Sequence, residues 1–569
     1  MPAMKDHEPN QPIPLRPIGI ASLLSVVLLW FAQPPAALWP LAMVALAPLV
    51  HLVTLAQPIS RRGYLIVWSA AFLYWLVSLQ GLRYAHWAMH FCWIALSAYL
   101  AAYHLLFLAS ARAMVSRNVP LVIAVAVAWT GQECLRGYLM TGISACLLGH
   151  TLADVPILIQ VADLLGSYGV SFVIAALNVG IYRAVRGIAG GQSVRRFAWN
   201  LVALDVVVAA VLIGLTTLYG SIRLRQPLGE SLGTFALVQR SEPVEYGQPI
   251  NRESEIFSAY ATDTLGAVGQ LEEPVDAVIW PESMFTAGNP WMMADRDALP
   301  PPSVDPGAPS MTQQDLQRGV AESREYFLQR AGYLLDAIAS QRPGKARPHL
   351  IVGSGVVHYR RRPEIYCGVI HIGSNKEVAD WYGKTHLVMF GEYIPILPHL
   401  PGLKRLVPPG LGLATGPGPK RFRLGDTVIS PNICIETAVE RVTVNQLSEL
   451  RQSGEAADLV VTVTNDGWFD DSSVIDHHRR CAQLVAVGCR RPILSAANNG
   501  PTVWIDSRGQ IIESIEQGGE GVLIAKPEKD SRTSWYLRIG DWPARGCALA
   551  SVLALLWPRI KSPSPKSKD

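Results

Sequence analysis

Charged residues are scarce in this chain of 569 residues: they account for 17% of it, whereas hydrophobic residues account for 50%. This balance is unusual for a soluble protein and common in proteins with several membrane spans. The net charge of +4 is small, and the basic residues form short clusters between apolar segments, without interleaved aromatic side chains. The composition therefore favours a membrane protein and speaks against a nucleic-acid partner.

Cysteines are also sparse, and the sequence lacks metal-binding and phosphate-binding motifs. The eight cysteines include no CxxC pair, so the sequence indicates neither a disulfide framework nor a zinc site. His477 and His478 are adjacent, which is poor spacing for two ligands of one metal ion on a helix. The sequence has no Walker-type glycine-rich loop, so nothing indicates a nucleotide-driven reaction. We expect no metal and no cofactor.

Long apolar runs dominate the N-terminal part of the sequence. Seven of them can span, or nearly span, a bilayer, and an eighth, weaker run lies near the C-terminus. Basic residues concentrate in alternate connecting loops, which by the positive-inside rule places both termini in the cytoplasm. The long segment between the seventh and eighth spans is then outside. The runs cover 18–32, 36–56, 64–80, 89–110, 119–136, 159–183, 199–219 and 543–558.

The segment 225–535 has a different pattern. Short β-rich runs such as "DAVIWPE" and "DLVVTVTN" alternate there with helix-like stretches such as "ESREYFLQRAGYLLDAIASQ". This alternation predicts a layered α/β or α+β domain on a membrane base. We therefore expect three parts: a membrane domain of about seven helices (1–222), an extracytoplasmic catalytic domain (223–538), and a last membrane helix with a basic tail (539–569).

Three β-like runs of this outer segment end in a reactive side chain. "DAVIWPESMF" carries Glu282, "DWYGKTHLVMFGEYIP" carries Lys384 and Glu392, and "SPNICIETAVE" carries Cys434 and Glu436. Rigid scaffolds place chemistry at strand ends, so these side chains could converge in one site. Taken singly, each residue also has a structural interpretation. Cys434 could be a buried structural thiol, Glu282 and Lys384 could form an ion pair, and the other two glutamates could be surface charges or supporting residues.

A cysteine attacks as its thiolate, so it needs a neighbouring base or cation. Glu282 suits the role of base, because a carboxylate in an apolar pocket, here walled by Trp280 and Phe285, has a raised pKa. Lys384 would stabilise the oxyanion of a tetrahedral intermediate. Cys434 would then be an acyl-accepting nucleophile.

The sequences of these segments resemble motifs of a known protein family. The order Glu, Lys, Cys in "IWPES", "YGKTHLVMFGEYIP" and "ICIE", followed by "TNDGWF" and "NNG", resembles the nitrilase superfamily. Within it, the "KTHLVMFGEYIP" block, the multispan N-terminal half and the closing "YLRIGDWP" before one last span are similar to the apolipoprotein N-acyltransferase family. The resemblance covers nearly the whole chain. It implies a nitrilase-like αββα sandwich joined to about seven plus one membrane helices.

The resemblance also implies roles and partners. Glu282 would be the general base, Lys384 the oxyanion stabiliser and Cys434 the nucleophile, with Glu392 and Glu436 as supporting carboxylates. An acyl chain would pass from a phospholipid, through a Cys434 thioester, to the α-amine of a diacylglyceryl-modified apolipoprotein. The protein would be a monomer in the bacterial inner membrane, with its catalytic domain on the periplasmic side.

A lid is expected around this site. The segment 387–418 is apolar and rich in proline and glycine, which predicts either a mobile lid or a packed core loop. The residues expected to contact substrate or lid are Trp280, Phe390, Tyr393, Trp468 and Asn499.

The chain also departs from the family pattern. Ile435 stands where the family usually has an aromatic residue, and Tyr246 stands about where a tryptophan is usual. A Pro-rich insertion (298–310) lengthens the spacing from Glu282 to Lys384. Two other functions remain open at this point. The same three residues could serve a membrane-tethered amidase or hydrolase that uses water as acceptor. Alternatively, the fold could be a membrane receptor or scaffold without catalysis.

Overall fold

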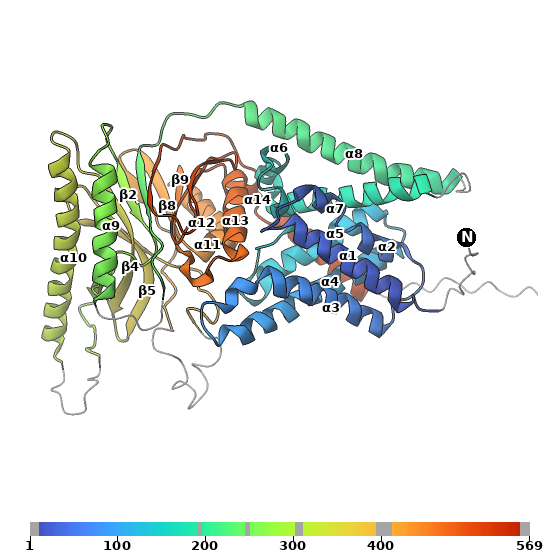
Figure 1. Ribbon diagram of the computed structural model, residues 1–569, viewed down its shortest axis with the longest axis horizontal. Helices are drawn as coiled ribbons and strands as arrows, with labels where there is room; N and C mark the ends of the chain where they lie inside the picture. The colour runs from blue at the N-terminus through green and yellow to red at the C-terminus, as the bar shows by residue number, and fades with distance from the viewer. Residues whose placement is uncertain (1–10, 190–195, 245–250, 302–310, 394–411, 558–569) are drawn as a thin grey trace, which may run out of the picture.

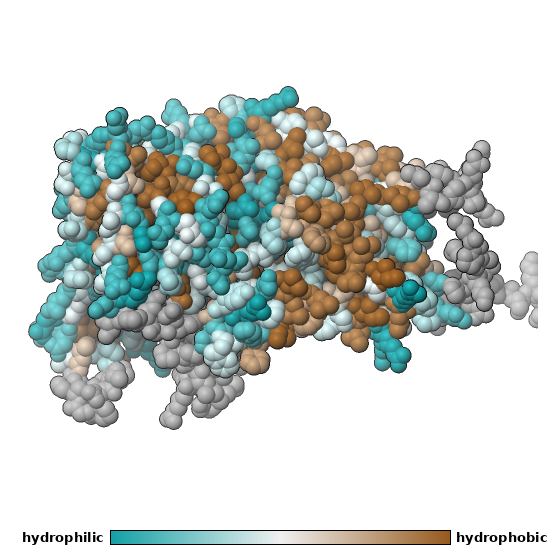
Figure 2. Space-filling model, viewed as in Figure 1, coloured by the Kyte–Doolittle hydropathy of each residue, from teal (hydrophilic) through white to brown (hydrophobic). Residues whose placement is uncertain are grey.

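The computed structural model describes residues 11–189, 196–244, 251–301, 311–393 and 412–557. It has a bundle of apolar helices at one end and a layered α/β domain at the other (Figure 1). The bundle comes from the N-terminal part of the chain, and the last helix, α15 (Trp542–Leu556), returns to it and packs on α5 (Leu121–Tyr138). Hydrophobic side chains gather over the bundle and hydrophilic ones over the α/β domain (Figure 2).

Six further helices make up most of the bundle. In the described residues, four stretches are long and apolar enough to cross a membrane: Leu15–Ala32, Met89–Val115, Ala162–Gly187 and Ala203–Arg225. The prediction of several apolar helices before an α/β domain is thus confirmed, while the number of membrane spans stays a prediction. The helices are α1 (Leu15–Ala32), α2 (Ala47–Thr54), α3 (Arg61–Ser78), α4 (Met89–Val115), α7 (Ala162–Ala189) and α8 (Arg196–Arg225).

The second predicted run, 36–56, is not one continuous helix. It divides into a 3-10 turn, η1 (Trp39–Met43), and the short helix α2. Pro48 lies in the first turn of α2 and has no N–H to donate into the preceding turn, so a new helix begins there. Proline therefore breaks an apolar stretch that hydropathy alone treats as one span.

The α/β domain contains two sheets that pack face to face. The first has the strand order β13-β1-β2-β4-β5-β6, with β3 paired to β4, and the second has the order β12-β11-β10-β9-β8-β7. Apolar side chains such as Ile279, Ile433 and Val463 fill the space between the sheets. The strands are β1 (Phe235–Gln239), β2 (Ala277–Trp280), β3 (Trp291–Ala294), β4 (His349–Tyr359), β5 (Pro363–Ile372), β6 (Val378–Gly383), β7 (Phe422–Leu424), β8 (Thr427–Ile433), β9 (Leu459–Asn465), β10 (Ile493–Asn498), β11 (Thr502–Ile505), β12 (Ile511–Ile515) and β13 (Gly521–Ala525).

Helices cover the outer faces of both sheets. The first sheet packs against α9 (Arg252–Val268) and α10 (Gln313–Gln341), and the second against α12 (Glu440–Gln452) and α13 (Ser473–Cys489). The domain thus has four layers, with α10 at the end far from the bundle (Figure 1). Strands β1, β2 and β4 are parallel, as are β8, β9 and β10, so within each set the C-terminal ends lie at one edge.

Buried ion pairs join the two parts of the molecule. Asp163 of α7 lies 2.6 Å from Nη2 of Arg223 in α8 and 2.6 Å from Nη2 of Arg490, which follows α13. Both Asp163 and Arg490 are buried. Within the bundle, Asp205 pairs with Arg183 at 2.8 Å. Acidic residues on apolar helices are costly unless paired, and here each has a basic partner.

Candidate active site

Three strand ends bring the predicted reactive residues together. Glu282 follows β2, Lys384 follows β6 and Cys434 follows β8. The Nζ atom of Lys384 lies 3.6 Å from Oε1 of Glu282 and 2.6 Å from Oε1 of Glu392. The charges of Lys384 and Glu282 both act on the Cys434 thiol. The structure thus places a thiol, a carboxylate and an ammonium in one buried site between the sheets.

The Lys384 side chain is 1% exposed, so its charge depends on its neighbours. Burial by itself lowers the pKa of this ammonium, but the carboxylates of Glu282 and Glu392 outweigh it and hold the pKa well above its usual value. Lys384 is therefore a fixed cation. A fixed cation can stabilise negative charge that develops on a nearby oxygen.

Glu282 has the properties of a proton acceptor. Burial raises the pKa of its carboxyl group, and the nearby Lys384 ammonium opposes this shift. Its Oε2 accepts a hydrogen bond of 3.2 Å from the backbone N–H of Asn465, and its Oε1 accepts one of 3.1 Å from the thiol of Cys367. The carboxylate is thus held in place from two sides.

Cys434 sits at a sharp turn between β8 and the short helix α11 (Ile435–Ala438). Its backbone has φ 48° and ψ −114°, a conformation that a residue with a Cβ rarely adopts and that often marks a functional site. Burial raises the pKa of its thiol to about 12, although the Lys384 ammonium acts in the opposite direction. The thiol is therefore protonated at rest and needs a base when it attacks.

His478 supports the strained backbone of the cysteine. Its Nε2–H donates to the carbonyl oxygen of Cys434 at 3.0 Å, while Nδ1 lies 3.5 Å from Oδ1 of Asp466. Burial lowers the pKa of His478, but these two partners outweigh it and raise the pKa above its usual value. The imidazole thus ties α13 to the turn that carries the nucleophile.

Glu436 connects the cysteine turn to the lysine segment. Its Oε1 accepts hydrogen bonds from the hydroxyl of Tyr382 (2.7 Å) and from the backbone N–H of Thr385 (2.7 Å). Its Oε2 accepts from the backbone N–H of Ile433 at 2.8 Å. Because Ile433 directly precedes Cys434 and Thr385 directly follows Lys384, this buried carboxylate fixes the two segments relative to each other.

Trp280 does not lie where the sequence interpretation placed it. Its indole N–H donates to Oγ1 of Thr264 in α9 at 3.0 Å, and the ring packs in the core between the first sheet and its helices. Phe285 belongs to the same outer core. The expectation that these two rings wall the pocket is therefore wrong, because both lie on the face of the sheet opposite to the inter-sheet space.

The other predicted contact residues lie in different segments of the α/β domain, and their contact with substrate stays a prediction. Phe390 is 41% exposed and its N–H donates to the carbonyl of Tyr393 at 2.7 Å, in the segment that holds Glu392. Trp468 is half-buried in the 3-10 turn after β9. The side chain of Asn499 accepts a hydrogen bond from Ser241 at 2.8 Å. Most of the predicted lid (394–411), much of the Pro-rich insertion (302–310) and Tyr246 lie outside the described residues.

Sequence reasoning missed three residues around this site. Cys367 in β5 contacts Glu282, and His478 in α13 contacts the carbonyl of Cys434. Neither residue lies in a recognisable sequence motif. The third is Asn498, the neighbour of the predicted Asn499. Its amide donates to Oδ1 of Asn465 at 3.0 Å, so it supports the residue whose backbone N–H donates to Glu282.

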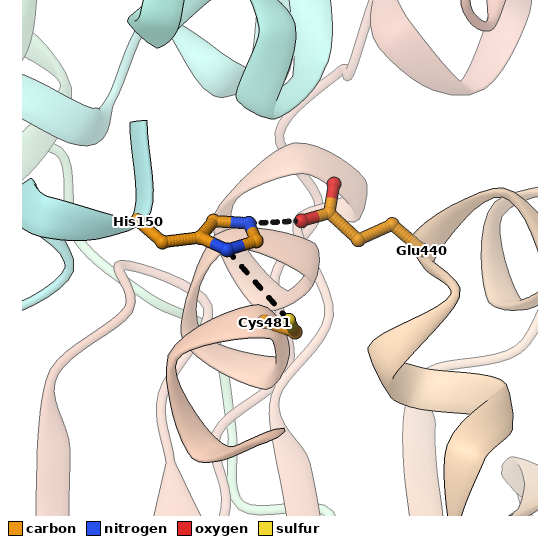
Figure 3. A group of neighbouring side chains, drawn as sticks. All are labelled: His150, Glu440 and Cys481. Atoms are coloured by element: carbon orange, nitrogen blue, oxygen red, sulfur yellow. Dashed lines mark hydrogen bonds and ion pairs between the residues drawn. The ribbon is translucent and has the colours of Figure 1, made fainter. Parts of the chain in front are cut away.

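A second buried cluster lies between the helix bundle and the α/β domain. Nε2 of His150 lies 2.6 Å from Oε1 of Glu440, and Sγ of Cys481 lies 3.7 Å from Nδ1 of the same ring. The carboxylate and the thiol approach opposite ring nitrogens (Figure 3), and the N–H of Leu147 also donates to Nδ1. A metal ion needs ligand atoms that converge on one point. The three side chains are instead joined by hydrogen bonds through the two nitrogens of the His150 ring.

Comparison with known proteins gives the family. Residues 25–180 match the apolipoprotein N-acyltransferase N-terminal domain, and residues 247–536 match the carbon-nitrogen hydrolase family. An apolipoprotein N-acyltransferase of Rhodopirellula baltica is 43% identical, over 95% of this chain and 97% of that protein. One of Geobacter metallireducens is 30% identical, over 95% and 96%.

Solved structures also match. An amidase of the nitrilase superfamily from Nesterenkonia aligns with 55% of this chain and 95% of its own, at 16% identity and a TM-score of 0.34. This likeness does not bear on activity. The extent and identity of the two sequence relatives decide the matter: the chain belongs to the apolipoprotein N-acyltransferase family, within the carbon-nitrogen hydrolase superfamily.

Proposed function

We propose that this protein transfers a fatty acyl chain from a phospholipid, through a thioester on Cys434, to the α-amine of the lipidated N-terminal cysteine of an apolipoprotein. Family membership supports acyl transfer in lipoprotein maturation. The observation that carries the residue roles is the position of Lys384, whose ammonium lies between Glu282 and Glu392 and acts on the Cys434 thiol.

The first half of the reaction forms the thioester. Glu282 takes the proton of the Cys434 thiol, and the sulfur attacks the ester carbonyl carbon of the phospholipid. Lys384 stabilises the oxyanion, a contribution worth about 3 to 4 kcal/mol for one well-placed donor. When the intermediate collapses, the C–O bond breaks and Glu282 returns its proton to the departing lysophospholipid oxygen.

The second half transfers the acyl chain to nitrogen. The acceptor amine attacks the thioester carbonyl, Glu282 takes a proton from that nitrogen, and the C–S bond breaks. The proton then passes to the sulfur of Cys434 and restores the resting thiol. An ester is exchanged for a thioester and then for an amide, so the sequence of steps needs no nucleotide.

The exposed side chains of the bundle support a lipid donor, and the charges of its loops support the proposed orientation. Leu65, Leu73, Leu215 and Leu218 are each more than half exposed on its helices, as expected for side chains that contact lipid. The basic loops favour cytoplasmic termini and an α/β domain on the outer side of the bacterial inner membrane. We take the active species to be a monomer.

A labelled transfer experiment tests this function. The purified protein is incubated with a phospholipid that carries a labelled acyl chain and with a diacylated lipopeptide, and we expect an N-acylated peptide. Mass spectrometry should find an acyl adduct on the intact wild-type protein and on the control variant Cys92→Ala, but not on Cys434→Ala. Free fatty acid as the sole product would identify a hydrolase, and an enzyme without an adduct would contradict the thioester route.

A further inference from the structure

Cys367 is a second cysteine at the active site. It lies in β5, and its thiol donates a hydrogen bond of 3.1 Å to Oε1 of Glu282. The side chain is buried in the core between the two sheets. This is the oxygen of Glu282 that faces Lys384 at 3.6 Å.

The backbone of Cys367 contacts the lysine as well. Its carbonyl oxygen accepts the N–H of Lys384 at 2.9 Å, at the point where β5 and β6 pair. One residue therefore touches two of the three residues to which the transfer reaction is assigned. It touches the carboxylate through its side chain and the lysine through its main chain.

The thiol of Cys367 is suited to act as a permanent hydrogen-bond donor to Glu282. Burial, and then the charge of Glu282, hold the pKa of Cys367 well above its usual value, so the S–H bond persists throughout the working pH range. A donor to an ionised carboxylate favours the ionised form. A thiol is a weak donor, so it can orient Oε1 while reducing the basicity of the carboxylate less than a hydroxyl would.

We propose that Cys367 is a positioning residue: its thiol holds Oε1 of the base Glu282, and its carbonyl holds the backbone of Lys384. The assignment rests on the proposed function, because it takes Glu282 as the base. Cys367 is not a second nucleophile, since its S–H bond is directed at a carboxylate and the side chain is buried.

Besides the uncharged thiol of Cys367, several charged groups face Glu282. We expect them to remain in place when Cys367 is changed. The segment after β6 contributes Lys384 and Glu392, and the turn after β9 contributes Asp466. The charge of the same carboxylate also acts on the thiol of Cys434, which follows β8. A change confined to Cys367 therefore alters one hydrogen bond and leaves these charges unchanged.

The test measures how fast iodoacetamide alkylates Cys434 across a pH series, followed at the Cys434 peptide by mass spectrometry. This rate reports removal of the thiol proton by Glu282 and needs no lipid. Cys367→Val has a similar volume without a donor, and Cys367→Ser has a stronger donor. We expect the inflection of the profile to move to higher pH in the valine variant and to lower pH than wild type in the serine variant, whereas Cys92→Ser leaves it unchanged.

A shift of one pH unit appears as about a tenfold change in rate on the acidic side of the profile. Equal inflections in wild type, valine and serine variants would overturn the proposal. If the valine variant does not fold, the serine variant alone decides, because a profile equal to wild type contradicts a hydrogen bond to the base. A wild-type enzyme that never forms an acyl adduct would refute the proposed function while leaving this alkylation series interpretable.

Discussion

The Nζ atom of Lys384 lies closer to Oε1 of Glu392, at 2.6 Å, than to Oε1 of Glu282, at 3.6 Å. The shorter contact gives the ammonium a counter-ion other than the proposed base. Glu282 is thereby left able to accept a proton while the cation stays in place. The two carboxylates thus have different proposed roles: Glu392 neutralises the lysine and Glu282 accepts the proton.

Replacing Glu392 by glutamine removes that counter-ion. The ammonium should then pair directly with Glu282 and weaken it as a base, so we expect acyl transfer to fall by about 10- to 100-fold, the scale of one charge-assisted hydrogen bond. The measurement is the rate of labelled acyl transfer at saturating lipid. The matched control is Glu377→Gln, which changes an exposed carboxylate and should retain full activity. Wild-type rates in Glu392→Gln would contradict the assigned role.

The rate of thioester formation should depend on pH through Glu282. Because burial raises the pKa of this carboxyl group, the rate should fall as the pH drops through that raised value, and the fall should begin above the range of an ordinary glutamate. Single-turnover acylation of Cys434 across a pH series gives the profile. Glu282→Gln should lose this acidic limb together with most of its activity, and a limb of unchanged shape in that variant would assign it to another group.

Glu436→Gln should destabilise the catalytic domain. The amide presents an NH2 group to donors that now face a carboxylate, so at least one of them loses its partner. A buried donor left without an acceptor costs about 1 to 3 kcal/mol. Thermal unfolding followed by circular dichroism measures the loss, and acyl transfer should fall at the same time because Thr385 and Ile433 adjoin Lys384 and Cys434. An unchanged melting temperature would show that the contacts of Glu436 contribute little.

The junction between the bundle and the α/β domain should depend on Asp163. Asp163→Asn leaves Arg490 buried without its counter-ion, which costs about 3 to 5 kcal/mol for a broken buried pair. The comparison is Asp336→Asn, which removes an exposed partner of Arg347 and Lys376 and should leave the melting temperature nearly unchanged. Detergent-solubilised protein would be unfolded thermally for both variants. Equal melting temperatures would mean that this pair does not stabilise the junction.

The sequence could single out the candidate residues of the site because each closely follows a β-rich run. Lys384 and Cys434 come directly after a strand and Glu282 comes two residues after one, and strand ends are where a rigid scaffold places reactive side chains. Trp280 could not be placed in the same way. The run "AVIW" is buried on both faces, so its hydrophobicity has no alternation to show that Ile279 faces the other sheet while Trp280 faces α9.

The supporting residues depend on contacts between distant segments. Cys367 meets Glu282 across 85 positions of sequence, and the buried part of its strand is mostly apolar. His478 meets the Cys434 carbonyl across 44 positions. Neither residue stands beside a motif, and only the pairing of the strands and the packing of α13 bring them to the site. The break in the second apolar run was likewise hidden, because hydropathy does not register the missing N–H of Pro48.

The buried pairing of Asp163 with Arg223 and Arg490 has a consequence for the choice of acceptor. A buried ion pair is costly to break, so these contacts oppose rocking of the α/β domain on the helices. The sulfur of Cys434 then keeps one position relative to the helix bundle. In the proposed reaction an acceptor must bring its amine to that position on its own tether, so we expect acceptors whose amine cannot reach it to be poor substrates.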